Sequence, residues 1–359
     1  MVGVVALNLA GEPGARKTGD WPVRGPGFWY LSRAAAFPLQ KPHFKRCYRC
    51  AVLAGAHVST AGGIHTAIDR AVERGAEAVQ IFTQSPRAWR PTNHPAENLQ
   101  RFKERRAEEG IGAVVCHALY LINLATPDKT VWDKSRASLL HTVGVACAIE
   151  ADGVVLHVGS HLGAGFEEGL GHAVPALEEA LAACGGPTWI LLENSAGAGG
   201  TIGRSVDELE ALMDRLDGHP RLGLCLDSCH LWVSGVDVTD PATVEATVSD
   251  VDRRIGLDRL RCLHVNDAAA PLGSNRDRHA NVCSGEMGEG LGAFLADKRL
   301  QGLPAILETP GPDNHGPDAA EVTRLRELHA RWTGATRPSR SGRRPGRTAS
   351  RGGARKTRG

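Results

Sequence analysis

Residues 222–232 read LGLCLDSCHLW, and this stretch holds the pattern on which the fold prediction rests. Leu222, Leu224 and Leu226 form an apolar run typical of a buried strand, which stops at Asp227, with His230 three residues later. A single Asp in this position is most simply the N-cap of a helix, and a nearby His is often only packed. Whether this pair is structural or functional therefore depends on how the other strands end.

Apolar runs of the same kind recur along the chain and alternate with longer amphipathic segments. The eight predicted strands are 52–57, 78–83, 112–117, 153–158, 188–193, 222–227, 261–266 and 304–309. Predicted helices lie between them, for example over 65–75 and 205–216. This alternation predicts βαβ units and a parallel sheet that is buried on both faces. Eight units over about 280 residues predict an α/β fold, a single-domain (β/α)8 TIM barrel.

A doubly wound sheet is the alternative fold, because GAGGTIG at 197–203 resembles a phosphate-binding loop. Its glycine spacing is GxGxxxG rather than GxGxxG, and it does not open the first βαβ unit. The barrel is therefore favoured.

The sequence predicts a protein that neither spans a membrane nor is secreted. No apolar run approaches the length of a membrane span, and the first residues lack the basic region and cleavage site of a secretory signal. The cysteine count, nine, is odd, and several cysteines lie in strand-like apolar runs, which indicates reduced thiols in the cytoplasm. Cys47 and Cys50 form a lone CxxC, which we interpret as incidental.

Charge is distributed unevenly along the chain. Residues 1–50 are basic, and residues 337–359 contain nine Lys or Arg and no acidic residue, so the segment between them is acidic although the whole chain has a net charge of only +2. An acidic core suits bound cations. The C-terminal arm lacks apolar residues to bury, so we expect it to be disordered, and its charge suits a polyanion such as DNA. A solvated tail without a partner is the alternative.

Residues of the types that commonly bind metals stand at or just after the ends of six consecutive predicted strands, from the third to the eighth. The candidate ligands are His117, His157, Glu193, Asp227, His230, His264, Asp277, His279 and Glu308. In a TIM barrel the carboxyl ends of all strands meet on one face, where uncompensated carboxylates would repel one another and bound cations would relieve that repulsion. Five imidazoles and four carboxylates suit zinc, manganese or iron rather than calcium, and their number fits two or three ions.

Eight longer segments carry a resemblance to a known family. They are GAHVSTAGG (55–63), IFTQSPRAWRP (81–91), CHALYLINLATPD (116–128), LHVGSHLG (156–163), LLENSAGAGGTIG (191–203), LCLDSCH (224–230), LHVNDAAAPLGSNRDRH (263–279) and LETPGP (307–312). In this order they resemble endonuclease IV (AP endonuclease family 2), the trinuclear-zinc apurinic/apyrimidinic endonucleases. The resemblance implies a (β/α)8 barrel that cuts DNA on the 5′ side of abasic sites, leaving a 3′-hydroxyl and a 5′-deoxyribose phosphate.

The resemblance also distributes the candidate ligands over three zinc ions, with manganese or iron as alternatives in some sites. The implied sets are His117, His157 and Glu193 for the first ion; Glu193, Asp227, His264 and Glu308 for the second; and His230, Asp277 and His279 for the third. Glu308 and the bridging Glu193 are the implied catalytic residues, Glu308 by orienting the attacking hydroxide. Metal ions suit this chemistry because they make water a nucleophile near neutral pH and neutralise charge on the phosphate.

The resemblance implies that two of these loops contact DNA. Arg87 in SPRAW, and Tyr120 with Leu121 in ALYLINL, lie where the family inserts side chains into the duplex at the abasic site. The alternative is that Tyr120 and Leu121 only pack within their loop. One departure is Cys283 in ANVCSGEMGEG, at a position where the family usually has glycine, which puts the geometry of that loop in question.

We therefore expect three parts in the chain. Residues 1–50 form an extension without a family counterpart, for which a mis-assigned start is one explanation; residues 51–335 form the metal-dependent barrel, and residues 336–359 the basic tail. The expected partner is double-stranded DNA that contains abasic sites. We expect the protein to be a monomer in the cytoplasm, associated with the nucleoid through its DNA substrate. The alternatives are a sugar isomerase or epimerase with the same barrel, and a damage-binding protein without catalysis.

Overall fold

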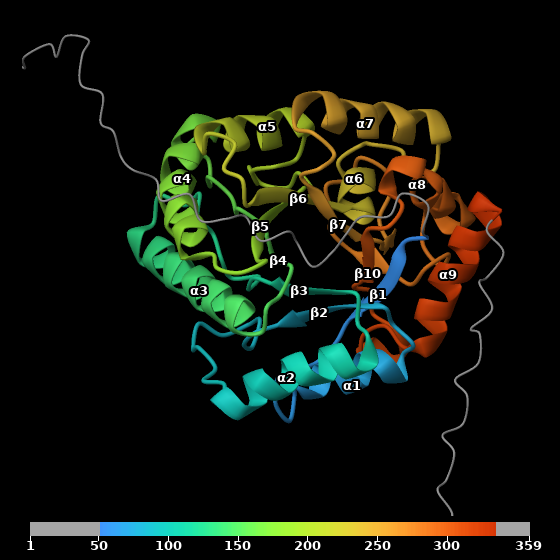
Figure 1. The fold of residues 1–359 in the computed structure, drawn as a ribbon. Helices are drawn as coiled ribbons and strands as arrows, with labels where there is room; N and C mark the ends of the chain where they lie inside the picture. Colours follow the sequence, from blue (N-terminus) through green and yellow to red (C-terminus); the bar gives the residue numbers. More distant parts are fainter. Residues whose placement is uncertain (1–50, 335–359) are drawn as a thin grey trace, which may run out of the picture. The chain divides into compact units, whose positions relative to one another are not determined.

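The computed structural model describes residues 51–334, and the arms considered above lie outside the described residues. Eight parallel strands close into a barrel in the order β1-β10-β7-β6-β5-β4-β3-β2, which confirms the (β/α)8 prediction (Figure 1). The barrel strands are β1 (Leu53–His57), β2 (Ala78–Phe82), β3 (Ala113–His117), β4 (Gly153–Leu156), β5 (Trp189–Glu193), β6 (Leu222–Asp227), β7 (Leu260–His264) and β10 (Pro304–Leu307). Each lies within two residues of its predicted bounds.

Helices surround the barrel and cover the outer face of the sheet (Figure 1). They are α1 (Thr66–Glu73), α2 (Ala96–Glu109), α3 (Lys129–Ala148), α4 (Phe166–Ala183), α5 (Val206–Arg215), α6 (Ser228–Val233), α7 (Pro241–Arg254), α8 (Gly292–Ala296) and α9 (Ala319–Thr333). The helices predicted over 65–75 and 205–216 correspond to α1 and α5. Within residues 51–334, none of these helices is long and apolar enough to cross a membrane.

Side chains alternate between the two faces of each strand, and this alternation builds two separate cores. On β6, Leu222, Leu224 and Leu226 pack into the large core beneath the helices, whereas Cys225 belongs to a small cluster inside the barrel. The buried members of this inner cluster are Ala78, Ala113, Val115, Val155, Leu191, Cys225, Cys262 and Ile306. Space inside the barrel is narrow: a Cβ atom on Gly55 would lie 2.5 Å from Ile306 Cδ1. The inner cluster closes the barrel below its carboxyl-terminal mouth.

A short hairpin carries the loop after β7 back over the mouth of the barrel. Its strands β8 (Asp267–Ala268) and β9 (His279–Ala280) are antiparallel. The buried Asp267 carboxylate accepts hydrogen bonds from the backbone N–H groups of Ala268, Gly285, Met287 and Gly288. A buried carboxylate that accepts four backbone donors holds this loop in one conformation.

Cys283 lies in the loop that Asp267 organises, at the position where a glycine was expected. Its φ of 61° is in the left-handed region that glycine adopts freely. A side chain with Cβ in this region costs about 1–2 kcal/mol. The loop thus keeps a glycine-like backbone at Cys283, at a cost in strain.

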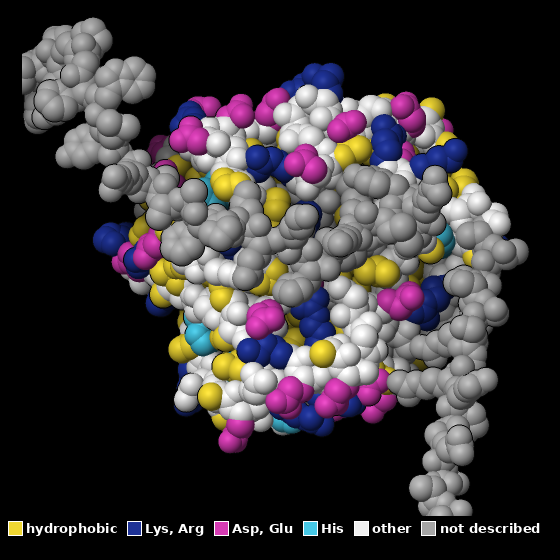
Figure 2. Space-filling model, in the orientation of Figure 1, with side chains coloured by type: hydrophobic (Ala, Val, Ile, Leu, Met, Phe, Trp, Pro, Cys, Tyr) yellow, Lys and Arg dark blue, Asp and Glu magenta, His cyan; other side chains and the backbone are white. Residues whose placement is uncertain are grey.

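Charged side chains of both signs are interspersed over the helices on the face seen in Figure 2. Partly exposed ion pairs join neighbouring helices, as between Arg254 of α7 and Glu210 of α5 at 2.6 Å. Exposed pairs of this kind contribute only about 0–1 kcal/mol each. The barrel therefore owes its stability mainly to its two apolar cores.

Candidate metal centre

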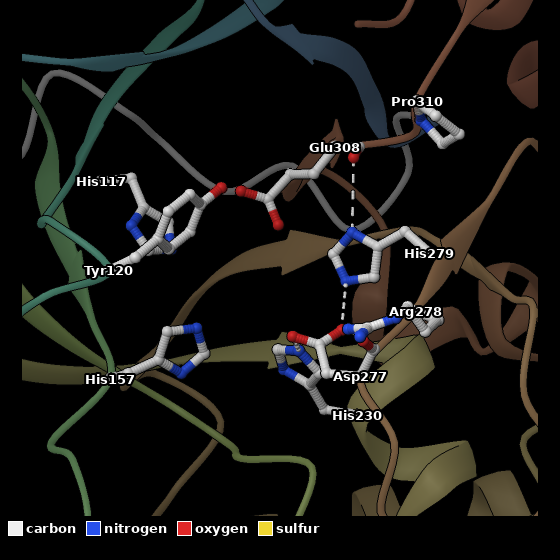
Figure 3. Close-up of a pocket in the computed structure, with 9 residues that line it drawn as sticks. All are labelled: His117, Tyr120, His157, His230, Asp277, Arg278, His279, Glu308 and Pro310. Atoms are coloured by element: carbon white, nitrogen blue, oxygen red, sulfur yellow. Dashed lines mark hydrogen bonds and ion pairs between the residues drawn. The ribbon is translucent and has the colours of Figure 1, made fainter. Parts of the chain in front are cut away.

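The nine candidate ligands all lie at the carboxyl-terminal mouth of the barrel. A cavity of about 270 Å³ opens there (Figure 3). Its lining residues are His117, Tyr120, His157, His230, Asp277, Arg278, His279, Glu308 and Pro310. The three remaining candidates, Glu193, Asp227 and His264, have no exposed surface.

Glu193 is the centre of the cluster, and its two oxygen atoms face different imidazoles. Oε2 lies 3.3 Å from His117 Nε2 and 3.2 Å from His157 Nε2. Oε1 lies 2.9 Å from His264 Nδ1 and 3.3 Å from His230 Nδ1. Each oxygen of this carboxylate therefore lies between two imidazoles, an arrangement compatible with the predicted bridge between ions.

A second group forms around Asp277, on the loop before β9. Its two oxygen atoms lie 3.3 Å from His230 Nε2 and 3.2 Å from His279 Nε2. His279 Nδ1 donates a hydrogen bond to the backbone oxygen of Glu308, so that Nε2 points towards Asp277 (Figure 3). Asp227 Oδ2 lies 3.9 Å from His279 Nε2 and connects this group to the first.

Asp227 is the N-cap of a helix and also lies within the cluster of candidate ligands, so the structure allows it to be both a cap and a ligand. Its Oδ1 accepts the backbone N–H of His230 at 2.7 Å and caps α6, as a simple N-cap would. Its Oδ2 accepts a hydrogen bond from Asn266 Nδ2 at 2.7 Å and also faces the imidazoles of the cluster. Asn194 Oδ1 accepts the Asp227 N–H, which further fixes this carboxylate.

Two residues of the site, His57 and Gln80, were missed by the sequence analysis. Gln80, fully buried on β2, donates to Glu308 Oε1 at 2.6 Å and accepts from His264 Nε2 at 2.8 Å. Its amide also donates to His57 Nδ1 at 3.0 Å, at the end of β1. Gln80 thereby fixes the His264 tautomer and leaves Nδ1 available to an ion. His57 could have been recognised by its position at the end of the first predicted strand. Gln80 could have been recognised as a polar residue at an inward-facing strand position.

Backbone oxygens orient two other imidazoles. His117 Nδ1 donates to the oxygen of Ala118 at 2.6 Å, and His230 Nδ1 donates to the oxygen of Asn194 at 2.9 Å. The Nε2 atoms of both rings are then free to bind a metal. Outer hydrogen bonds of this kind are typical of metal-ligating histidines.

The pKa values of the clustered side chains indicate that buried carboxylates such as that of Glu193 stay ionised and require positive charge beside them. Burial acts to raise the pKa of Glu193, but His157 and His264 outweigh it and hold that pKa well below its usual value. Burial acts to lower the pKa of His279, but Asp277 raises it to about 9, whereas burial lowers the pKa of His157 to about 4. Protons on imidazoles whose pKa is raised, such as that of His279, would compensate the buried carboxylates. Metal ions would replace those protons.

The donor atoms fit a metal centre with more than one ion. Three buried atoms of the cluster, His117 Nε2, Glu193 Oε2 and His279 Nε2, have no hydrogen-bond partner among the described residues. Several groups have ligand atoms within 4.8 Å of one another, among them His117, Glu193 and His264; His157, Glu193 and His230; His230, Asp277 and His279; and Asp227, Cys229 and His279. Nitrogen and oxygen donors in this mixture suit zinc, manganese or iron.

The three residues expected to contact DNA lie on loops near this mouth. Tyr120 is 58% exposed and points into the cavity, with its ring packed edge-on against Phe82 at 5.1 Å. Arg87 is exposed on the loop after β2. Leu121 is half-buried. The structure thus brings Tyr120 to the cavity, and its contact with DNA stays a prediction.

Residues 68–328 match the family model described as xylose isomerase-like TIM barrel. A probable endonuclease 4 of Halothermothrix orenii is 37% identical over 273 residues, covering 76% of this chain and 98% of that protein. A probable endonuclease 4 of Natronomonas pharaonis is 38% identical over 279 residues, covering 77% of this chain and 99% of that protein.

Solved structures agree with these relatives. Endonuclease IV from Thermus thermophilus matches with a TM-score of 0.68 and 34% identity, covering 78% of this chain and 99% of that chain. A D-tagatose 3-epimerase-like protein matches with a TM-score of 0.57 at 17% identity, covering 77% of this chain and 98% of that chain, and shares the fold alone. The sequence resemblance is thus confirmed: the chain belongs to the endonuclease IV family, AP endonuclease family 2.

Proposed function

We propose that this protein is a DNA-repair endonuclease that hydrolyses the phosphodiester bond on the 5′ side of abasic sites in double-stranded DNA. The products would be a 3′-hydroxyl and a 5′-deoxyribose phosphate. The observation that carries the proposal is the buried cluster around Glu193, which opens into a cavity in a chain of the endonuclease IV family. Such a centre suits hydrolysis of a phosphodiester without a Ser or Cys nucleophile.

We further propose that the ions are zinc, three per chain. The sets are His117, His157 and Glu193; Glu193, Asp227, His264 and Glu308; and His230, Asp277 and His279. The two faces of Glu193 support its bridging role, and the contacts of Asp277 support the third set. Bound zinc would lower the pKa of a water molecule and neutralise charge on the phosphate.

Glu308 is the proposed catalytic carboxylate. It lines the cavity, and the hydrogen bond from Gln80 to its Oε1 leaves Oε2 beside His264 Nδ1 at 3.1 Å. Its backbone N–H donates to Asn266 Oδ1 at 2.8 Å, which fixes the start of the loop after β10. A carboxylate held in this way can orient the attacking water and accept its proton. Arg278 at the cavity edge adds a positive charge that suits the phosphate.

Elemental analysis tests the metal proposal directly. Purified active protein is expected to contain about three zinc-class ions per chain, because nine ligands at three or four per ion require that number. Buried ions leave slowly, so a chelator should remove activity over time rather than at once. Active protein with one ion or none would contradict the proposal, and an abasic-duplex cleavage assay on the same sample gives the activity.

Tyr120 is expected to act on recognition of the lesion. In Tyr120→Ala the supported ring at the cavity edge is lost, so discrimination between abasic and intact duplex should fall by about tenfold, since inserted side chains compensate for lost base stacking. Competition binding with the two duplexes measures this ratio. Metal content should stay unchanged, and an unchanged ratio would show that Tyr120 only packs within its loop.

The basic arm at 337–359, which lies outside the described residues, gives a prediction from charge alone. Its nine Lys or Arg can displace counterions from any duplex. Deleting 337–359 should therefore weaken binding to abasic and intact DNA alike and flatten the dependence of log affinity on log salt. Turnover at saturating substrate should stay near wild type. An equal salt slope in the two proteins would mean that the arm contributes nothing to binding.

A further inference from the structure

Two thiols lie inside the barrel, directly below the layer of candidate zinc ligands. Cys225 on β6 and Cys262 on β7 are register partners on adjacent strands, and both are fully buried. Two residues further along, the same strands pair Asp227 with His264. The thiols therefore form the next inward-facing layer beneath the proposed zinc centre.

The two sulfur atoms are close enough to share one ligand. Cys225 Sγ, Cys262 Sγ and a ring nitrogen of His264 all lie within 4.8 Å of one another. The proposed zinc sets contain no sulfur atom, so the thiol pair has no part in the function proposed above. The other buried members of the inner cluster are apolar, so no carboxylate there competes for the ion.

We propose that Cys225, Cys262 and His264 form a second metal site, for a soft, thiophilic divalent cation such as Cd²⁺. Thiolates select soft ions, whereas the imidazoles and carboxylates above them suit harder ones. Each thiol releases one proton to solvent as its sulfur binds the cation, so that two thiolates balance the two positive charges. This neutrality matters because an isolated charge in an apolar cluster would be costly.

The site has a consequence for the enzyme through His264. Its Nδ1 faces Glu193 at 2.9 Å, and it is a proposed ligand of the second zinc. An ion bound by the thiols would compete for this imidazole and so inhibit cleavage. Only this inhibition rests on the proposed function; binding of the cation by sulfur is independent of it.

The experiment uses zinc-loaded, full-length protein in which five other cysteines are replaced by serine. Cys147, Cys184 and Cys283 are half-buried, and Cys47 and Cys50 lie outside the described residues, so all five could bind the probe elsewhere. Titration with Cd²⁺ is followed by the ultraviolet absorbance of thiolate-to-cadmium charge transfer, which nitrogen and oxygen ligands do not produce. We expect the absorbance to saturate at one Cd²⁺ per chain.

Matched variants in this background locate the site. Cys225→Ala/Cys262→Ala should abolish the absorbance, whereas Cys116→Ala and Cys229→Ala, which remove other buried thiols, should keep it. Each single variant, Cys225→Ala or Cys262→Ala, should weaken Cd²⁺ binding by more than about tenfold. If the double variant does not fold, the two single variants still test the proposal. Absorbance that persists without both thiols, or that is lost with Cys116 or Cys229, would overturn the proposal.

Inhibition of cleavage is measured on the same proteins. The Cd²⁺ concentration that halves the rate should rise by more than about tenfold in Cys225→Ala/Cys262→Ala. Absence of cleavage in every protein, with the absorbance behaving as expected, would contradict the proposed function and leave the thiol site standing. Equal inhibition with and without the thiols would contradict the competition for His264.

Discussion

Replacing Glu308 by Gln is expected to reduce turnover on a saturating abasic duplex by about 10³-fold or more, while duplex binding stays within several-fold of wild type. The amide keeps the shape of the side chain but removes the negative charge that, in the proposed mechanism, would orient water and balance the neighbouring cations. Gln80 donates to Glu308 Oε1 at 2.6 Å, and the amide oxygen of the variant can still accept that bond. The loss should therefore appear in the chemical step and not in the fold.

Single-turnover cleavage and gel-shift binding measure the two quantities separately. Glu286→Gln is the matched control, because Glu286 is exposed on the 281–288 loop and the substitution changes the charge equally. We expect this control to cleave at the wild-type rate. A Glu308→Gln enzyme within several-fold of wild-type turnover would mean that another group performs this role.

Replacing Asp267 by Ala is expected to lower the free energy of unfolding by about 3–5 kcal/mol. The substitution removes a buried carboxylate and leaves up to four backbone N–H groups without their acceptor. Asp267 also belongs to the hairpin that places His279 of β9 at the cavity. We therefore expect loss of bound metal and of cleavage along with the lower stability.

Urea unfolding measures the stability, and elemental analysis the bound metal. Asp214→Ala serves as the control, since Asp214 is exposed on α5 and its loss should change stability by no more than about 0.5 kcal/mol. If Asp267→Ala unfolds at the same urea concentration as this control, the loop does not depend on the carboxylate.

Some residues of the site could be predicted from the sequence, and others could not. Histidine and carboxylate at strand ends are recognisable ligand types, so the nine candidates could be named before the structure was known. Gln80 could not, because an amide is not a usual ligand and its role depends on Glu308, which lies 228 residues away in the sequence. His57 ends the first predicted strand, but it was not distinguished from a packed histidine.

The thiol pair shows a different limit. The place of Cys225 in a strand-like apolar run predicts that it is buried. That it faces Cys262 depends on the register between β6 and β7, which shifts between Leu224 and Cys225. A shift of one residue would have moved one thiol to the other face of the sheet. In the structure the irregularity breaks the alternation on β7, where Leu260 and Leu263 both pack in the outer core while Cys262 faces inward.

The sequence by itself determined the architecture and the inventory of the site, because the periods of buried strands and amphipathic helices are local and eight such units have one natural closure. It also determined that ligand-type side chains follow six strands. Only the tertiary structure decided which atoms meet: Glu193 and His264 are 71 residues apart in the sequence, yet their oxygen and nitrogen lie 2.9 Å apart. Closure of the barrel and the register of its strands set that distance, and both arise from packing between segments that are remote along the chain.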